Sequence, residues 1–169
     1  MSTDQAAADS REPLPLGSRE RLAHARLQLL RDTRRQLDLQ LPRLDGELYA
    51  SADELAELRR IAIEGRGAQI RIVLHDPAAA LREDHRLIAL IQRLPSVIQV
   101  RVPQDPQDLA LTAACLLNDV GGYLRQPDAW APDGHAARHD RAAQRPLRQQ
   151  FEERWARAAP ATQLSALGL

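Results

Sequence analysis

Residues 111–125 read LTAACLLNDVGGYLR. An apolar run ends in Asn118 and Asp119, the pair Gly121 and Gly122 follows, and a second short run leaves the turn. This pattern is typical of a buried strand, a tight turn and a return strand. Because loops at strand ends often carry functional groups, Asp119 is the first candidate site residue.

The composition limits the classes of function. The chain has 169 residues, of which 23 are basic and 23 are acidic, so its formal net charge is zero. A balanced charge gives no global attraction to nucleic acid or to an anionic membrane. Every basic residue is an arginine, which excludes mechanisms that need a lysine, such as a Schiff base, a P-loop or a Ser-Lys dyad. Cys115 is the single cysteine, so no intrachain disulfide is expected.

The sequence shows no sign of export or of membrane insertion. No apolar run approaches the roughly 18 residues that a membrane-spanning helix needs. The first residues, MSTDQAAADS, lack the apolar segment of a signal peptide. We therefore expect a cytoplasmic protein without a membrane-spanning helix.

The first half of the chain predicts a short tail followed by alternating helices and strands. Residues 1–17 are small, polar and interrupted by prolines, so we expect a disordered tail, and residues 18–169 are expected to form a single α/β domain. Ser51 and Glu54 form a capping box that begins a helix. Periodicity predicts further helices over 19–35 and 84–94, and strands over 37–41, 70–74 and 97–102.

The second half predicts the strand pair of residues 111–125, a polar loop over 126–144, and a last helix. Pro146 suits the first turn of that helix, and Leu147, Phe151 and Trp155 share one of its faces. Alternating strands and helices favour an α/β fold, with a mixed sheet of about five to six strands and helices on both faces.

This order of elements resembles one half of a phospholipase D-like protein. LRRIAIEGRGAQIRIVLHDP at 58–77, followed by HRLIALIQRLPSVIQVRV at 85–102, is similar to the series of elements that precedes the catalytic strand pair in that family. The resemblance covers about residues 37–157. It is strongest to bacterial proteins of this size and undetermined function that carry such a half without the catalytic signature.

The family signature H-x-K-x4-D is incomplete in this chain. If Asp119 takes the place of the aspartate, Thr112 stands at the histidine position and Ala114 at the lysine position. The resemblance implies that the histidine attacks phosphorus and that the lysine binds the phosphate. A threonine without an adjacent base and an alanine without a charge cannot replace them. The resemblance therefore predicts the fold without the family's catalysis, and we do not expect an enzyme of that kind.

Several other residues could support a different chemistry. His75 and His85 could act with Asp119 as acid–base groups of an atypical phosphate-directed hydrolase. Arg125 and Arg145, again with Asp119, could bind a phosphate-containing ligand.

Two features of the polar loop are less specific. His135 and His139 are four residues apart, as metal ligands on a helix are, but they lie in a segment with little apolar content. We expect neither a metal nor a cofactor. Trp130 could cover the strand ends or contact a partner.

Three functions follow from these observations. The first is a catalytically inactive phospholipase D-like domain that acts as a binding or regulatory module. The second is the atypical hydrolase. The third is an interaction module that docks on a partner enzyme, such as an acyltransferase, through its arginine-rich first helix. Because the resemblance implies a site built from two halves, we expect a homodimer or another protein partner. A phosphate-containing ligand fits the arginines, whereas we do not expect a membrane or, given an aromatic content of 3%, nucleic acid.

Overall fold

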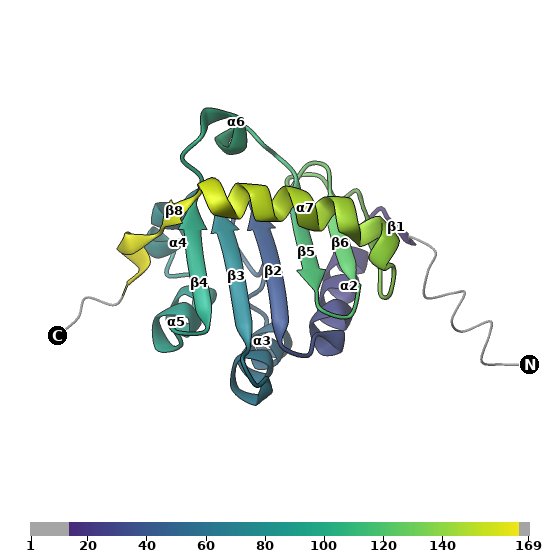
Figure 1. Cartoon of the computed structure of the whole chain (residues 1–169), viewed down its shortest axis with the longest axis horizontal. Helices are drawn as coiled ribbons and strands as arrows, with labels where there is room; N and C mark the ends of the chain where they lie inside the picture. Colours follow the sequence, from purple (N-terminus) through teal and green to yellow (C-terminus); the bar gives the residue numbers. More distant parts are fainter. Residues whose placement is uncertain (1–13, 166–169) are drawn as a thin grey trace, which may run out of the picture.

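The computed structural model of the chain describes residues 14–165. Eight strands in this part form one sheet, in the order β1-β7-β6-β5-β2-β3-β4-β8 (Figure 1). The central strands β2, β3 and β4 are parallel, and the other neighbouring strands pair antiparallel. The strands are β1 (Leu14–Leu16), β2 (Gln36–Leu41), β3 (Gln69–Leu74), β4 (Ile98–Val102), β5 (Ala114–Asn118), β6 (Tyr123–Gln126), β7 (Gly134–Ala137) and β8 (Ala159–Pro160).

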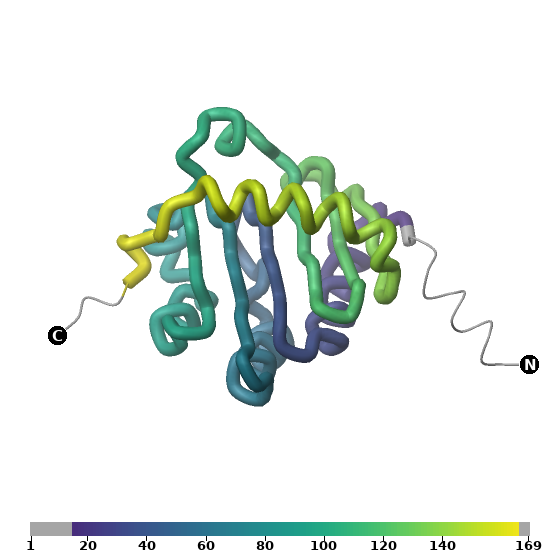
Figure 2. Tube along the Cα trace, viewed as in Figure 1, coloured from purple at the N-terminus to yellow at the C-terminus, as the bar shows by residue number. Residues whose placement is uncertain are grey.

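Helices cover both faces of the sheet. The helices are α2 (Arg19–Asp32), α3 (Ala52–Glu64), α4 (Pro77–Arg82), α5 (Arg86–Arg93), α6 (Pro106–Leu109) and α7 (Arg141–Arg157), followed by the short 3-10 helix η1 (Thr162–Leu164). Figure 1 shows α7 crossing one face while α2, α3 and α5 lie behind the other. Figure 2 follows the chain from β1 at one edge of the sheet to β8 at the other. The predicted fold class is therefore confirmed.

The predicted number of strands was too low, because the strands at the edges of the sheet carry almost no sequence signal. β1 falls in the expected tail, so only residues 1–13 of that tail lie outside the described residues. β7 lies in the segment predicted as a polar loop, and β8 has only two residues. Short edge strands need little apolar periodicity, since partner strands supply their hydrogen bonds.

Two helices differ from the prediction. The helix expected over 84–94 is α5, with His85 as its N-cap, and it is preceded by a short helix, α4, that was not predicted. The last helix begins at Arg141, after the N-cap Asp140, so Pro146 lies inside it. A proline there removes one intrahelical hydrogen bond. The helix nevertheless continues, because Phe151 and Trp155 bury their rings against the sheet, stacked with centroids 6.1 Å apart.

The alternation in β2 places different residues on the two faces of the sheet. Leu37, Leu39 and Leu41 belong to the larger hydrophobic core, which the helices α2, α3 and α5 cover. Asp38 and Gln40 are also buried, so β2 is inaccessible on both faces. The predicted capping box is confirmed at the start of α3, where Ser51 and Glu54 exchange hydrogen bonds.

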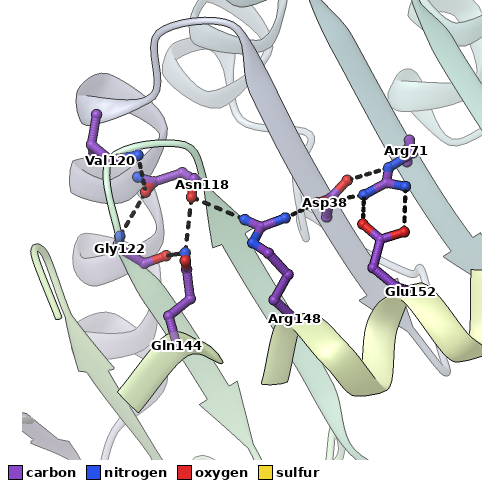
Figure 3. A network of polar contacts seen from close by, with 8 residues as sticks. All are labelled: Asp38, Arg71, Asn118, Val120, Gly122, Gln144, Arg148 and Glu152. Atoms are coloured by element: carbon purple, nitrogen blue, oxygen red, sulfur yellow. Dashed lines mark hydrogen bonds and ion pairs between the residues drawn. The ribbon is translucent and has the colours of Figure 1, made fainter. Parts of the chain in front are cut away.

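A buried charge network attaches α7 to the sheet (Figure 3). Asp38 is 0% exposed and accepts hydrogen bonds from Arg71 Nε at 2.7 Å, from Arg71 Nη2 at 3.0 Å and from Arg148 Nη1 at 2.6 Å. Arg71 also donates to Glu152 of α7 at 3.0 Å. Although burial opposes its charge, hydrogen bonds to Glu152 and Asp38 raise the pKa of Arg71. In turn, the hydrogen bond from Arg71 lowers the pKa of Glu152.

The turn between β5 and β6 is organised by Asn118, the single asparagine of the chain (Figure 3). Its Oδ1 accepts from Val120 N at 3.2 Å and from Gly122 N at 2.7 Å, and its Nδ2 donates to Leu29 O at 3.2 Å. Gln144 of α7 donates to the Asn118 carbonyl at 2.8 Å. Asn118 therefore joins the turn to a helix on each face of the sheet, through its side-chain amide to α2 and through its main-chain carbonyl to α7.

Candidate ligand-binding site

The three residues at the expected signature positions lie along one stretch of chain. Thr112 lies two residues before β5, Ala114 is its first residue, and Asp119 follows its last residue. Five steps of extended chain at ~3.3 Å each put Asp119 about 16 Å from Ala114. The carboxylate of Asp119 accepts from the backbone N–H groups of Arg34 at 3.0 Å and Arg35 at 3.1 Å. Asp119 therefore holds the loop before β2 in place.

The two candidate histidines make different hydrogen bonds in different parts of the structure. His75 follows β3, and its Nε2 lies 2.8 Å from Nε2 of Gln40. His85 is buried, and its Nδ1 accepts from Leu87 N at 3.2 Å as the N-cap of α5. Burial lowers the pKa of both imidazoles, so both are held neutral. In the described part of the chain, no hydrogen bond or ion pair connects either of them to Asp119.

Neither candidate arginine forms a hydrogen bond or ion pair with Asp119 among residues 14–165. Arg125 is in β6, opposite Cys115 and four residues along the chain from Asp119. Arg145 is an exposed residue of α7. The arginine that does reach the turn is Arg141, whose Nη2 donates to the Asp119 carbonyl at 3.2 Å. Phosphate binding by Asp119, Arg125 and Arg145 stays a prediction.

A cavity of about 570 Å³ lies instead at the carboxyl end of β2, beside the beginning of β5. We call it the edge pocket. Four separate stretches of the chain line it: residues 19–27 of α2, residues 41–54 up to the first turn of α3, residues 114–115 of β5, and residues 124–132. Ala114, Cys115, Leu124 and Leu41 form apolar parts of its wall. Its volume falls in the range of sites for small molecules, ~300–1,000 Å³.

One side of the edge pocket carries a buried polar cluster. Arg26 pairs with Glu54, and their side chains are only 11% and 4% exposed. The Arg26 guanidinium lies 5.2 Å from the ring centroid of Tyr49. Tyr49 is buried with a φ of 55°, a left-handed conformation that a bulky residue adopts only under strain. Burial raises the pKa of the Tyr49 hydroxyl, so this group remains a neutral donor.

The mouth of the edge pocket is formed by Arg43 and Trp130. Trp130 is 53% exposed although it lies on the pocket wall, and the Arg43 guanidinium is 5.9 Å from its ring centroid. Arg43 Nη2 contacts both carboxylate oxygens of Asp45, whereas its Nε is buried without a hydrogen-bond partner among the described residues. Trp130 N donates to Asp128 Oδ1 at 3.0 Å, which fixes the loop that carries the indole.

The side chains beside the pocket are not arranged for nucleophilic attack. The Thr112 hydroxyl donates to the Pro127 carbonyl at 3.2 Å, and Ala114 presents only a methyl group to the cavity. Burial raises the pKa of the Cys115 thiol to about 11, so this group is protonated at neutral pH. The arrangement favours binding of an apolar or aromatic group with an arginine at the mouth.

No group of three or more His, Cys, Asp or Glu side chains with the geometry of a metal site occurs in residues 14–165. His135 is in β7, and His139 follows it, with Nδ1 3.3 Å from the Val120 carbonyl. Across the same residues, every helix is too short or too polar to cross a membrane.

The sequence matches the model of a family described as a domain of unknown function (DUF7931) over residues 18–167. No curated protein matches it. Among solved structures, the phospholipase D family member Nuc from Salmonella typhimurium is similar with a TM-score of 0.60 at 12% identity, covering 88% of this chain and 98% of Nuc. Phosphatidylserine synthase from Haemophilus influenzae Rd KW20 is similar with a TM-score of 0.62 at 13% identity, covering 92% of this chain and 41% of that one. The expected phospholipase D-like fold is thereby confirmed.

A third similar structure corrects one prediction. TrmBL2, an archaeal chromatin protein whose structure shows a novel mode of DNA binding, has a TM-score of 0.64 at 11% identity. The match covers 95% of this chain and 57% of TrmBL2, so the chain spans little more than half the length of that relative. Excluding nucleic acid as a partner was therefore wrong, because this fold occurs in a DNA-binding protein that the low aromatic content did not anticipate.

Proposed function

Because the chain belongs to the DUF7931 family and has the phospholipase D-like fold, we propose that it is a non-catalytic binding domain whose ligand occupies the edge pocket. One observation carries the proposal. Ala114, at the expected lysine position of the family signature, lines a cavity of about 570 Å³ with a methyl group, and Thr112, at the expected histidine position, has its hydroxyl bonded to the Pro127 carbonyl.

The lining specifies the chemistry of the ligand. Most of the wall is apolar, and the Trp130 indole offers an exposed flat face at the mouth, which suits an aromatic or apolar body. The carboxylate of Asp45, which pairs with the Arg43 guanidinium group, is 42% exposed, so an anionic group on the ligand could displace it and gain a charge-assisted contact with Arg43. The proposed ligand is therefore a small molecule with an apolar or aromatic body and one anionic group.

The probe 8-anilinonaphthalene-1-sulfonate has this chemistry, so its fluorescence titration tests the proposal. We expect one binding site. Arg43→Gln should weaken binding about tenfold, the equivalent of about 1.4 kcal/mol for one charge-assisted hydrogen bond. Trp130→Ala should weaken it further, whereas the matched change Arg93→Gln on an exposed arginine of α5 should leave it unchanged. Equal affinities for the Arg43 and Arg93 variants would contradict the proposal.

Hydrolysis of bis-p-nitrophenyl phosphate tests the absence of catalysis. We expect the same background rate for the wild-type chain and for Asp119→Ala, because the Asp119 carboxylate accepts hydrogen bonds from two backbone N–H groups and from no side chain among the described residues. Turnover that disappears in Asp119→Ala, His75→Ala or His85→Ala would instead support the atypical hydrolase.

A further inference from the structure

A second hollow, of about 830 Å³, lies at the opposite end of the strands from the edge pocket. It is formed where the loop before β2, the loop between α3 and β3, the β5–β6 turn and the start of α7 meet. We call it the arginine groove. Four arginines line it: Arg34, Arg35, Arg66 and Arg141.

The charge of the arginine groove is strongly local. Its four arginines face two carboxylates, Glu64 and Asp119, which leaves a net charge of +2 in a chain whose total is zero. Among residues 14–165, none of these four guanidinium groups forms an ion pair with a carboxylate. The carboxylate of Asp119, which this net charge includes, accepts from the backbone N–H groups of Arg34 and Arg35 and not from a guanidinium group.

Close packing at two glycines brings arginine stems to the groove. A Cβ atom at Gly121, where φ is +87°, would meet Arg141 Cγ at 2.7 Å. A Cβ atom at Gly65 would meet Arg35 Cβ at 2.9 Å. Because both positions lack a side chain, the stems of Arg141 and Arg35 pack directly on the backbone. Less side-chain entropy is therefore lost when their guanidinium groups bind a ligand.

The form of the arginine groove selects a class of anion. All four arginines are exposed and come from separate segments, so they present several binding points along an open surface. A repeated phosphate suits such a surface better than a single small anion, because each guanidinium can contact a different phosphate. No aromatic side chain lines the groove, so it offers no platform on which unpaired bases could stack.

We propose that the arginine groove binds the phosphate backbone of duplex DNA, without reading its sequence. The start of α7 contributes to the same surface through the guanidinium group of Arg141, the first residue of this 17-residue helix. This inference is independent of the edge pocket, which lies at the other end of the strands and is lined by none of the four arginines.

Fluorescence anisotropy with a labelled duplex of about 20 base pairs tests the proposal. With four phosphate contacts, the logarithm of the association constant should fall with log[salt] at a slope of about −3.6, so binding weakens on the order of 100-fold between 50 and 200 mM NaCl. The double change Arg34→Gln with Arg66→Gln should reduce that slope by about 2. A second duplex of unrelated sequence should bind with the same affinity.

The control is Arg82→Gln with Arg93→Gln, which removes the same charge from exposed positions on α4 and α5. We expect this variant to bind DNA as the wild type does. Equal losses in both double variants, or tighter binding of polyglutamate or of single-stranded oligo(dT) than of the duplex, would overturn the proposal. Both double variants should retain the circular dichroism spectrum and bind 8-anilinonaphthalene-1-sulfonate normally, which separates failure here from failure of the edge pocket.

Discussion

Removing the charge of Asp38 should be among the most destabilising single changes in this domain. Asp38 is 0% exposed and accepts three hydrogen bonds from Arg71 and Arg148. Asp38→Asn keeps the shape of the side chain but replaces one acceptor by a donor that faces guanidinium groups. Arg71 keeps the carboxylate of Glu152, whereas Arg148 keeps only the Asn118 carbonyl at 3.1 Å.

The size of the effect follows from that imbalance. Breaking a buried pair by removing one partner costs ~3–5 kcal/mol. The side chain of Glu152 is 49% exposed, so its pair with Arg71 is partly screened, and Glu152→Gln should cost at most about 1 kcal/mol. Both changes replace a carboxylate by an amide, so the difference of about 2–4 kcal/mol between the two variants comes from the burial of Asp38 and from its contact with a second arginine, Arg148.

Urea unfolding followed by circular dichroism measures both variants. A double-mutant cycle of Asp38→Asn with Arg148→Met should give a coupling energy above about 1 kcal/mol, since the two residues contact each other directly. A cost below about 1 kcal/mol for Asp38→Asn, or equal costs for Asp38→Asn and Glu152→Gln, would refute the reasoning that burial sets the strength of this network.

Three further predictions concern single side chains. Asn118→Ala removes the acceptor of Gly122 N and the donor to Leu29 O, and should cost about 2–3 kcal/mol in urea unfolding; a cost below about 1 kcal/mol would show that the turn does not depend on this amide. His85 has its pKa lowered by burial, so the unfolded chain binds more protons than the folded one below about pH 6.5 and the domain loses stability as the pH falls. His85→Asn keeps an N-cap acceptor without titrating and should flatten the decline of unfolding free energy between pH 7 and 5; an unchanged slope would contradict this. Cys115, with its thiol pKa raised to about 11, should react with Ellman's reagent on the order of 100-fold more slowly in the folded than in the unfolded protein, and equal rates would disprove its burial.

The sequence alone predicted most of the central elements. The alternation of Leu37, Leu39 and Leu41, the capping box at Ser51 and the run at 70–74 all appear where the periodicity placed them. These signals are local, because side-chain period and capping chemistry depend on residues only a few positions apart. The edge strands and the start of α7 were missed, because partners distant in the sequence stabilise them.

The residues of the candidate sites could be identified from the sequence, but the contacts between them could not. The sequence placed Thr112 and Ala114 at the expected histidine and lysine positions of the signature, which stays a prediction, and Trp130 stood out as an aromatic residue in a polar loop. The edge pocket was not predicted, because its wall comes from four segments that no local spacing connects. Asp119 was singled out because of its turn, but the structure assigns its carboxylate to two backbone N–H groups.

The sequence by itself determined the α/β class, because periodicity is a property of the chain alone. Only the tertiary structure decided which side chains meet. It placed the Asp119 carboxylate on the backbone N–H groups of Arg34 and Arg35, and it gathered Arg34, Arg66 and Arg141 from distant segments at one end of the strands. The physical reason is that an extended strand holds residues a few positions apart at a distance of many ångströms, whereas pairing of strands in the sheet brings segments that are remote in sequence into contact.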